Sequence, residues 1–205
     1  MRKFVKWTLL GLGGLFGAVL LLAAAMTVST DVRYGVIYEL GKHVDLNLPV
    51  PQAALDRQIA ALKRADLVDQ DGKPFDWNAR PHAVIWFNEW AHWCVPCRME
   101  LPAMKALQGR VGRDRLRIVL FSQPKDWEAD KTLAKDLGLD FELVTARNPA
   151  EADLAAINLA KRSRDFLLPE TTFLRADGRG LIAMHELRDW DSAEWQANIE
   201  RWYRN

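Results

Sequence analysis

The sequence has few residues of the kinds that build metal centres. It contains two cysteines and four histidines among 205 residues, whereas a structural zinc site needs about four nitrogen or sulfur ligands. An excess of charge of one sign is also lacking, because 28 Lys and Arg balance 27 Asp and Glu for a net charge of +1. This balance argues against a general nucleic-acid-binding protein. Repeats and low-complexity tracts are absent, and the 49% hydrophobic content indicates one folded domain with a real core.

Acidic residues are missing from the first 30 positions, while basic residues stand near the start at Arg2, Lys3 and Lys6. Residues 9–28 carry no charge, and a helix of that length spans roughly 30 Å, the thickness of the membrane hydrocarbon core. The basic residues before this run direct the N-terminus to the cytoplasm. We therefore predict an N-terminal transmembrane helix within residues 1–30, with the rest of the chain in the bacterial periplasm. A cleaved signal peptide ending near "AAAM" is the alternative.

Apolar patterns divide the remainder into alternating helices and strands. Residues 51–65 have helical spacing, and "HAVIWF" is a continuous apolar run typical of a central strand. The runs "RLRIVLFS" and "FELVTA" follow as strands with helical segments after each, and the chain ends with a hairpin at "ADGRG" and an amphipathic helix. The pattern predicts an α/β fold with a central mixed sheet flanked by helices. We assign residues 31–65 to a linker or N-terminal extension and residues 66–205 to the folded domain.

Both cysteines lie in "WAHWCVPCRMELP", at a predicted junction between a strand and a helix. At the first turn of a helix, Cys94 would face unpaired backbone N–H groups, which favour a thiolate over a thiol. Cys97 follows one turn later, within reach of a mixed disulfide formed on Cys94. Pro96 suits a first helical turn, where a missing N–H costs little. The spacing predicts a redox-active disulfide, with no other cofactor.

Other uses of two close cysteines fit the sequence less well. Only His82 and His92 are at hand to complete a zinc site, and covalent haem attachment requires a histidine where Arg98 stands. A copper carrier would have three residues between its cysteines, and a peroxidase-type thiol would have Thr or Ser in place of Ala91. A purely structural disulfide that closes so short a loop would stabilise the fold little.

The segment "WAHWCVPCRMELP" resembles the active site of the thioredoxin superfamily, specifically the membrane-anchored TlpA/ResA/DsbE-type thiol:disulfide oxidoreductases. A second segment, "LLPETTFLRADGRG", resembles the cis-proline loop and hairpin of that family. The resemblance covers about residues 66–190 and implies a thioredoxin-like fold. It implies that Pro169 is the cis-proline beside the cysteines and that the backbone of Leu168 pairs with the substrate. We expect Trp93 and Pro96 to contact the substrate as well.

The acidic residues near the cysteines raise separate expectations. The resemblance implies that Glu100 is the acid that adjusts the properties of the cysteine pair. Physically, a partly buried carboxylate could accept the proton of Cys97. A solvated acid that interacts with the helix dipole is the alternative. Glu89 departs from the family, which has an apolar residue there, so it either has a buried partner or lies half exposed at a strand end. Glu89 and the neighbouring His92 are candidates for tuning the thiol pKa.

These features predict a membrane-tethered, periplasm-facing protein thiol-disulfide oxidoreductase in which Cys94 attacks, Cys97 resolves and Pro169 shapes the substrate groove. The resemblance implies reduction of envelope protein disulfides, for example in cytochrome c biogenesis, with electrons from a membrane reductant of the DsbD/CcdA type. One alternative is a non-enzymatic binding module with the same fold. A thiol oxidase of the DsbA type is another, although the chain between "FELVTA" and Pro169 is short for the helical insertion of that group.

Overall fold

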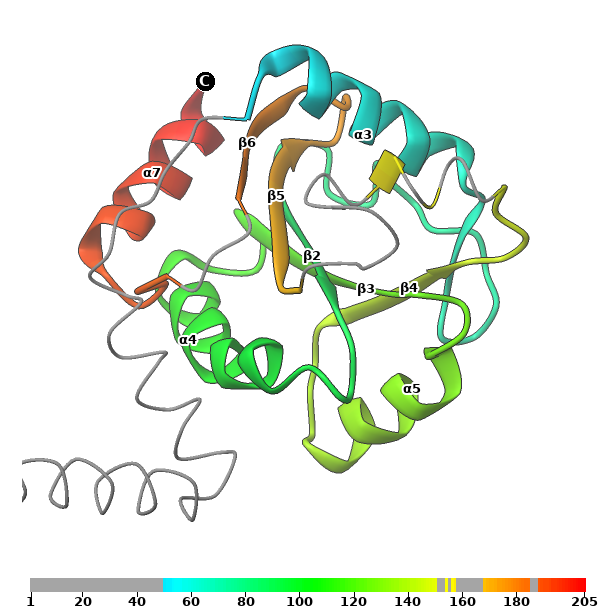
Figure 1. Cartoon of the computed structure of the whole chain (residues 1–205). Helices are drawn as coiled ribbons and strands as arrows, with labels where there is room; N and C mark the ends of the chain where they lie inside the picture. Colours follow the sequence, from blue (N-terminus) through cyan, green and yellow to red (C-terminus); the bar gives the residue numbers. More distant parts are fainter. Residues whose placement is uncertain (1–49, 151–153, 155, 158–167, 185–187) are drawn as a thin grey trace, which may run out of the picture. The chain divides into compact units, whose positions relative to one another are not determined.

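The computed structural model describes residues 50–150, 154, 156–157, 168–184 and 188–205. These residues form a six-stranded mixed sheet with helices around it (Figure 1). The strands are β1 (Leu67–Asp69), β2 (Val84–Trp90), β3 (Leu116–Ser122), β4 (Glu142–Ala146), β5 (Glu170–Arg175) and β6 (Gly180–Met184). They lie in the order β1-β4-β3-β2-β5-β6. β2, β3 and β4 are parallel neighbours, and β1, β5 and β6 pair antiparallel with the strands beside them. The predicted mixed sheet is confirmed.

β2 lies inside the sheet and is buried along its whole length. Successive side chains of a strand point to opposite faces, so Trp86 and Trp90 join one hydrophobic cluster while Ile85 and Phe87 join another. This arrangement accounts for the continuous apolar run that marked the strand in the sequence. β2 continues past that run to Trp90.

Helices cover both faces of the sheet (Figure 1). α4 (Val95–Val111), α5 (Trp127–Asp136) and α7 (Ala193–Arg204) contribute side chains to the cluster that contains Trp86. The crossovers β2–α4–β3 and β3–α5–β4 advance in the same direction across the sheet, and because such connections are right-handed, α4 and α5 lie on the same face. α3 (Gln52–Arg64) contributes to the cluster on the opposite face, with Phe87.

α3 lies within the segment that we assigned to an extension. Its apolar residues Leu55, Ile59 and Leu62 are buried, and the helix approaches β6 closely, because a Cβ added to Gly180 would lie 2.5 Å from the side chain of Leu55. Glycine at this position therefore permits the contact. α3 is packed as part of the core, while the proposed boundary at residue 66 stays a prediction.

The predicted hairpin near the C-terminus is confirmed. β5 and β6 pair antiparallel, and Gly178 in the turn between them has a φ of +89°, a conformation that favours glycine over other residues. The predicted transmembrane helix, in contrast, falls on residues 9–28, outside the described residues. Each helix within the described residues is too short or too polar to cross a membrane.

Candidate redox site

The two cysteines form a disulfide at the start of α4, with their Cα atoms 5.3 Å apart. Cys94 is the N-cap of the helix, and its Sγ accepts a hydrogen bond from the backbone N–H of Cys97 at 3.2 Å. The sulfur therefore faces the N-terminal end of the helix dipole, as the sequence predicted. Pro96 stands in the first helical turn. Cys94 is 4% exposed and Cys97 1%, so both are buried, and the attacking role of Cys94 stays a prediction.

The elements expected to bind substrate lie near the disulfide. Trp93, directly before the first cysteine, is 51% exposed. The Leu168–Pro169 peptide bond is cis, as the family resemblance implies, and Leu168 packs against the cluster that contains both cysteines. Because Glu170 is paired with Glu89 near the end of β2, Pro169 lies beside the point where the chain leaves β2 for the cysteines. The role of these residues in substrate binding stays a prediction.

A buried amide from α3 holds the residue that follows Pro169. The Nε2 of Gln58 donates to Glu170 Oε1 at 2.5 Å and to the carbonyl oxygen of Ile157 at 2.6 Å. Its Oε1 accepts from the hydroxyl of Thr172 at 2.9 Å. These three hydrogen bonds satisfy the side chain where it is buried, and they connect α3 to the start of β5.

Glu100 lies on the buried side of α4, one turn after Cys97, and is fully enclosed. Its Oε1 accepts the indole N–H of Trp190 at 2.7 Å. Burial raises the pKa of Glu100 from 4.5 to about 8, against smaller lowering effects from Trp190 and Asn88. A carboxyl group with this pKa can take and release a proton near neutral pH. Its burial excludes the alternative of a solvated acid near the helix N-terminus.

Polar side chains from β2 and β5 meet on the face of the sheet that α4, the helix of Glu100, covers. The hydroxyl oxygen of Thr171 accepts from Asn88 Nδ2 at 3.0 Å and from Trp86 Nε1 at 3.2 Å. Asn88 and Thr171 are register partners on adjacent strands, which places the two side chains next to each other. Near Glu100 the sheet therefore presents uncharged polar groups.

Glu89 is buried, with 2% exposure, so of its two predicted environments the half-exposed strand end is wrong and the buried one with a partner is confirmed. Its carboxylate accepts a hydrogen bond from Gln123 Nε2. Asn88 and Trp90 point toward the α4 face, and because side chains alternate along β2, Glu89 points to the opposite face with Phe87. The sheet separates Glu89 from α4, and we assign it no role at the cysteines.

His92 is bound twice by one buried carboxylate. Its backbone N–H donates to Asp130 Oδ1 at 2.6 Å, and its ring Nδ1 lies 2.8 Å from the same oxygen. Asp130, on α5, is fully buried, and burial raises its pKa above the ordinary aspartate value, while the bonds to His92 lower it. The His92 side chain is 37% exposed. The pair thus ties the loop before the first cysteine to α5.

Sequence reasoning did not select Trp190 or Asp130. Trp190 lies 90 residues from its partner Glu100, and Asp130 lies 38 residues from His92. Neither residue stands in a motif. The pattern around Asp130 is that of an ordinary amphipathic helix with acidic residues in its first turn, so no local signal could have identified it.

No family model matches the chain. Among curated proteins, the thioredoxin-like protein YneN of Bacillus subtilis is 27% identical over 122 residues, a match that covers 57% of this chain. The match covers 65% of that relative, slightly less than two thirds of its length.

Solved structures show the same fold. A thiol:disulfide interchange protein of the thioredoxin family from Chlorobium tepidum matches with a TM-score of 0.53 at 21% identity, covering 66% of this chain and 90% of that one. A secreted disulfide oxidoreductase of Mycobacterium tuberculosis, homologous to DsbE of E. coli, matches with a TM-score of 0.50 at 18% identity, covering 68% and 98%. A secreted thiol-disulfide isomerase of Corynebacterium glutamicum gives 0.52 at 18% identity, covering 68% and 83%.

The fold is therefore thioredoxin-like, with a Cys-x-x-Cys disulfide at the first turn of the helix that follows a central strand. The likeness to these solved structures, at 21% identity or less, shows the fold of the chain.

Proposed function

We propose that this chain reduces disulfides in other proteins by thiol–disulfide exchange. The observation that carries the proposal is the Cys94–Cys97 disulfide at the N-terminus of α4, with the buried carboxyl group of Glu100 one turn further along. An inert staple would need neither the helix N-terminus nor a proton-accepting group with a pKa of about 8.

In the first step, the reduced protein attacks its client. The helix N-terminus stabilises the Cys94 thiolate, which displaces one sulfur of a client disulfide. A bond forms between Cys94 Sγ and the other client sulfur, and the displaced sulfur leaves as a thiolate. In this step the client contacts the exposed side chain of Trp93 and the Leu168–Pro169 segment.

In the second step, the mixed disulfide is resolved. The thiol of Cys97 gives its proton to the carboxylate of Glu100, and the new thiolate attacks Cys94 Sγ. The Cys94–Cys97 disulfide forms and the second client sulfur departs as a thiolate. Two electrons have passed from the dithiol to the client, whose two thiolates take up protons. A second dithiol must then reduce the enzyme for another cycle.

We further propose that residues 9–28 anchor the protein in the bacterial inner membrane with its redox domain in the periplasm. The basic residues before this apolar run support that orientation. The clients are then envelope proteins, apocytochromes c among them, and the second dithiol belongs to a membrane reductant of the DsbD/CcdA type. No cofactor beyond the disulfide is required for this chemistry.

Client trapping tests the proposal. A full-length Cys97→Ser variant expressed in its bacterial host should accumulate client proteins as mixed disulfides on Cys94, because the resolving thiol is missing. The matched control is the Cys94→Ser variant, which keeps the other thiol and should capture far less. Equal capture by both variants, or none by either, would count against the reductase.

The reduction potential gives the direction of electron flow. A value on the reducing side of about −200 mV supports net reduction, while a value near about −120 mV is that of a strong thiol oxidase. A protein that exchanges with no model disulfide would instead be the non-enzymatic module.

A further inference from the structure

The segment that precedes α7 brings an indole N–H to the buried acid of the redox site. Trp190 Nε1 lies 2.7 Å from Glu100 Oε1, and both residues are fully buried. The second oxygen, Oε2, has no hydrogen-bond partner among the described residues. The amide of Asn88 donates one N–H to Thr171 at 3.0 Å, and a hydrogen bond from Asn88 also lowers the pKa of Glu100. Of the two side chains that lower this pKa by hydrogen bonding, Trp190 has the larger effect.

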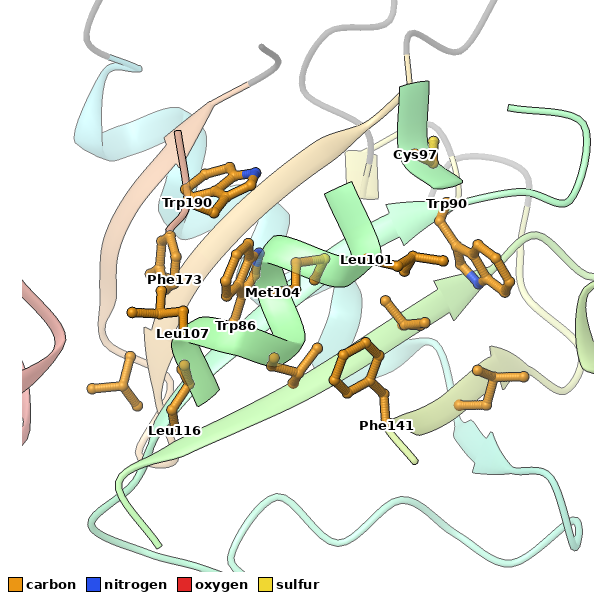
Figure 2. Packing of buried hydrophobic residues seen from close by; sticks show 14 of the residues in the cluster. Trp86, Trp90, Cys97, Leu101, Met104, Leu107, Leu116, Phe141, Phe173 and Trp190 are labelled. Atoms are coloured by element: carbon orange, nitrogen blue, oxygen red, sulfur yellow. The ribbon is translucent and has the colours of Figure 1, made fainter. Parts of the chain in front are cut away.

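The indole of Trp190 packs against aromatic rings from three elements of the fold. Its centroid lies 4.6 Å from the ring of Trp86 on β2, 4.7 Å from Trp195 on α7 and 6.0 Å from Phe173 on β5. Figure 2 shows Trp190 beside Phe173 and Trp86 at one end of the cluster, with Cys97 farther along it. A donor fixed in this way needs no reorganisation when charge appears on its acceptor.

Among the residues that the structure describes, no charged side chain contributes to the shifted pKa of Glu100. Burial, Trp190 and Asn88 account for the shifted pKa of Glu100. β2 and β5 present the uncharged Asn88 and Thr171. The charged residues on the segment of Trp190 and the adjoining turn of α7 are Arg188, Asp189, Asp191 and Glu194, of which Asp191 is paired with Arg110 at the surface.

We propose that Trp190 is a positioning residue of the redox site, whose indole N–H stabilises ionised Glu100 and leaves Oε2 open to receive the proton of Cys97. This inference rests on the proposed function, in which Cys97 resolves the mixed disulfide. The proton moves from Cys97 Sγ to Glu100 Oε2, the Cys97 thiolate forms the bond to Cys94 Sγ, and the bond to the client sulfur breaks.

Removing the N–H should move this step to higher pH. Without the donor, the buried carboxylate loses a charge-assisted hydrogen bond, so the acid stays protonated to higher pH. For each pH unit of that change, the ionised fraction at neutral pH falls about tenfold. Trp190→Phe keeps an aromatic ring in the cluster and removes the N–H.

The resolution step can be followed with a chromogenic disulfide. Full-length reduced protein mixed with dithionitrobenzoate releases one thionitrobenzoate anion as Cys94 is captured and a second as Cys97 resolves. The rate of the second release should rise with pH through the ionisation of Glu100. In Trp190→Phe its midpoint should move up by about one pH unit, with about tenfold slower release at neutral pH and recovery at high pH.

Trp195→Phe is the matched control, since this ring packs on Trp190 and Phe173 while the bond to Glu100 comes from Trp190. It should leave the midpoint of the profile in place. A uniform slowing in both variants, with no change of midpoint, would overturn the role of Trp190. Absence of any second release in the wild type would instead refute the proposed function itself.

A second measurement needs no folded Trp190 variant. In the oxidised full-length protein, the indole ¹⁵N–¹H resonance of Trp190 should move with pH as Glu100 titrates near pH 8. In Glu100→Gln this movement should vanish. The same pH dependence of the Trp190 resonance in the wild type and in Glu100→Gln would refute the proposal.

Discussion

Replacing Glu100 by glutamine should stabilise the oxidised protein, and most strongly above pH 8. The carboxyl group is fully buried, and burial moves its pKa from 4.5 to about 8. At about 1.4 kcal/mol for each pH unit, the folded state disfavours the ionised form by about 5 kcal/mol relative to the unfolded chain. Glutamine has nearly the same shape, keeps an oxygen to accept the N–H of Trp190 and carries no charge.

The sign follows from the protons that each state binds. The unfolded chain releases this proton near pH 4.5 and the folded protein near pH 8, so the folded state holds the extra proton between these values. The contribution of Glu100 to stability is therefore complete below about pH 4.5 and is lost as the pH rises through about 8. The free energy of unfolding of the wild type should fall relative to that of the variant across this range and run parallel to it above.

Urea unfolding between pH 4 and pH 9, with the disulfide intact, measures this difference. Subtracting the two curves removes the contributions of every other titrating group, Asp130 included. Glu194→Gln, at an exposed position on α7, is the control and should follow the wild type. A constant difference between wild type and Glu100→Gln from pH 4 to pH 9 would show that Glu100 is not desolvated as described.

Two further substitutions test the packing and the polar contacts. Gly180→Ala should lower the free energy of unfolding in urea by about 1–3 kcal/mol, because its Cβ would lie 2.5 Å from the side chain of Leu55. Gly109→Ala, in α4 with nothing within 4 Å of the added Cβ, should raise it by about 0.5–1 kcal/mol, and losses of similar size at both positions would contradict this. His92→Ala should lower the melting temperature more at pH 7 than at pH 4, since it removes the ring partner of buried Asp130. The pKa of Asp130 is raised, so at low pH the carboxyl group is neutral and the loss of its partner costs less stability. An equal drop at both pH values would refute that explanation.

The parts of the site that the sequence predicted are those in which one short segment contains the chemistry. The spacing of Cys94 and Cys97, with Pro96 between them, suits a helix N-terminus whatever the rest of the chain does. Pro169 could be placed for a similar reason, since the motif around it is also continuous. The order of strands and helices followed from local apolar periodicity.

The remaining parts depend on contacts between distant segments. The sequence left two environments open for Glu89, because the apolar run ends at Phe87 while β2 continues to Trp90. Only the register of the finished sheet shows that residue 89 is enclosed. Trp190 and Asp130 carry no signal of their own. Each meets its partner because a helix or turn from elsewhere in the chain packs there.

The packing of α3 determines where this protein can be divided. The resemblance stated from the sequence begins near residue 66, yet a fragment that started there would leave Ile85, Phe87 and the rest of one sheet face without the helix that covers them. It would also remove Gln58, and with it the hydrogen bonds that hold the residue after Pro169. The smallest portion that keeps the redox site intact therefore starts before α3, and grafting the cysteine motif and proline loop alone into another protein would not transfer the site.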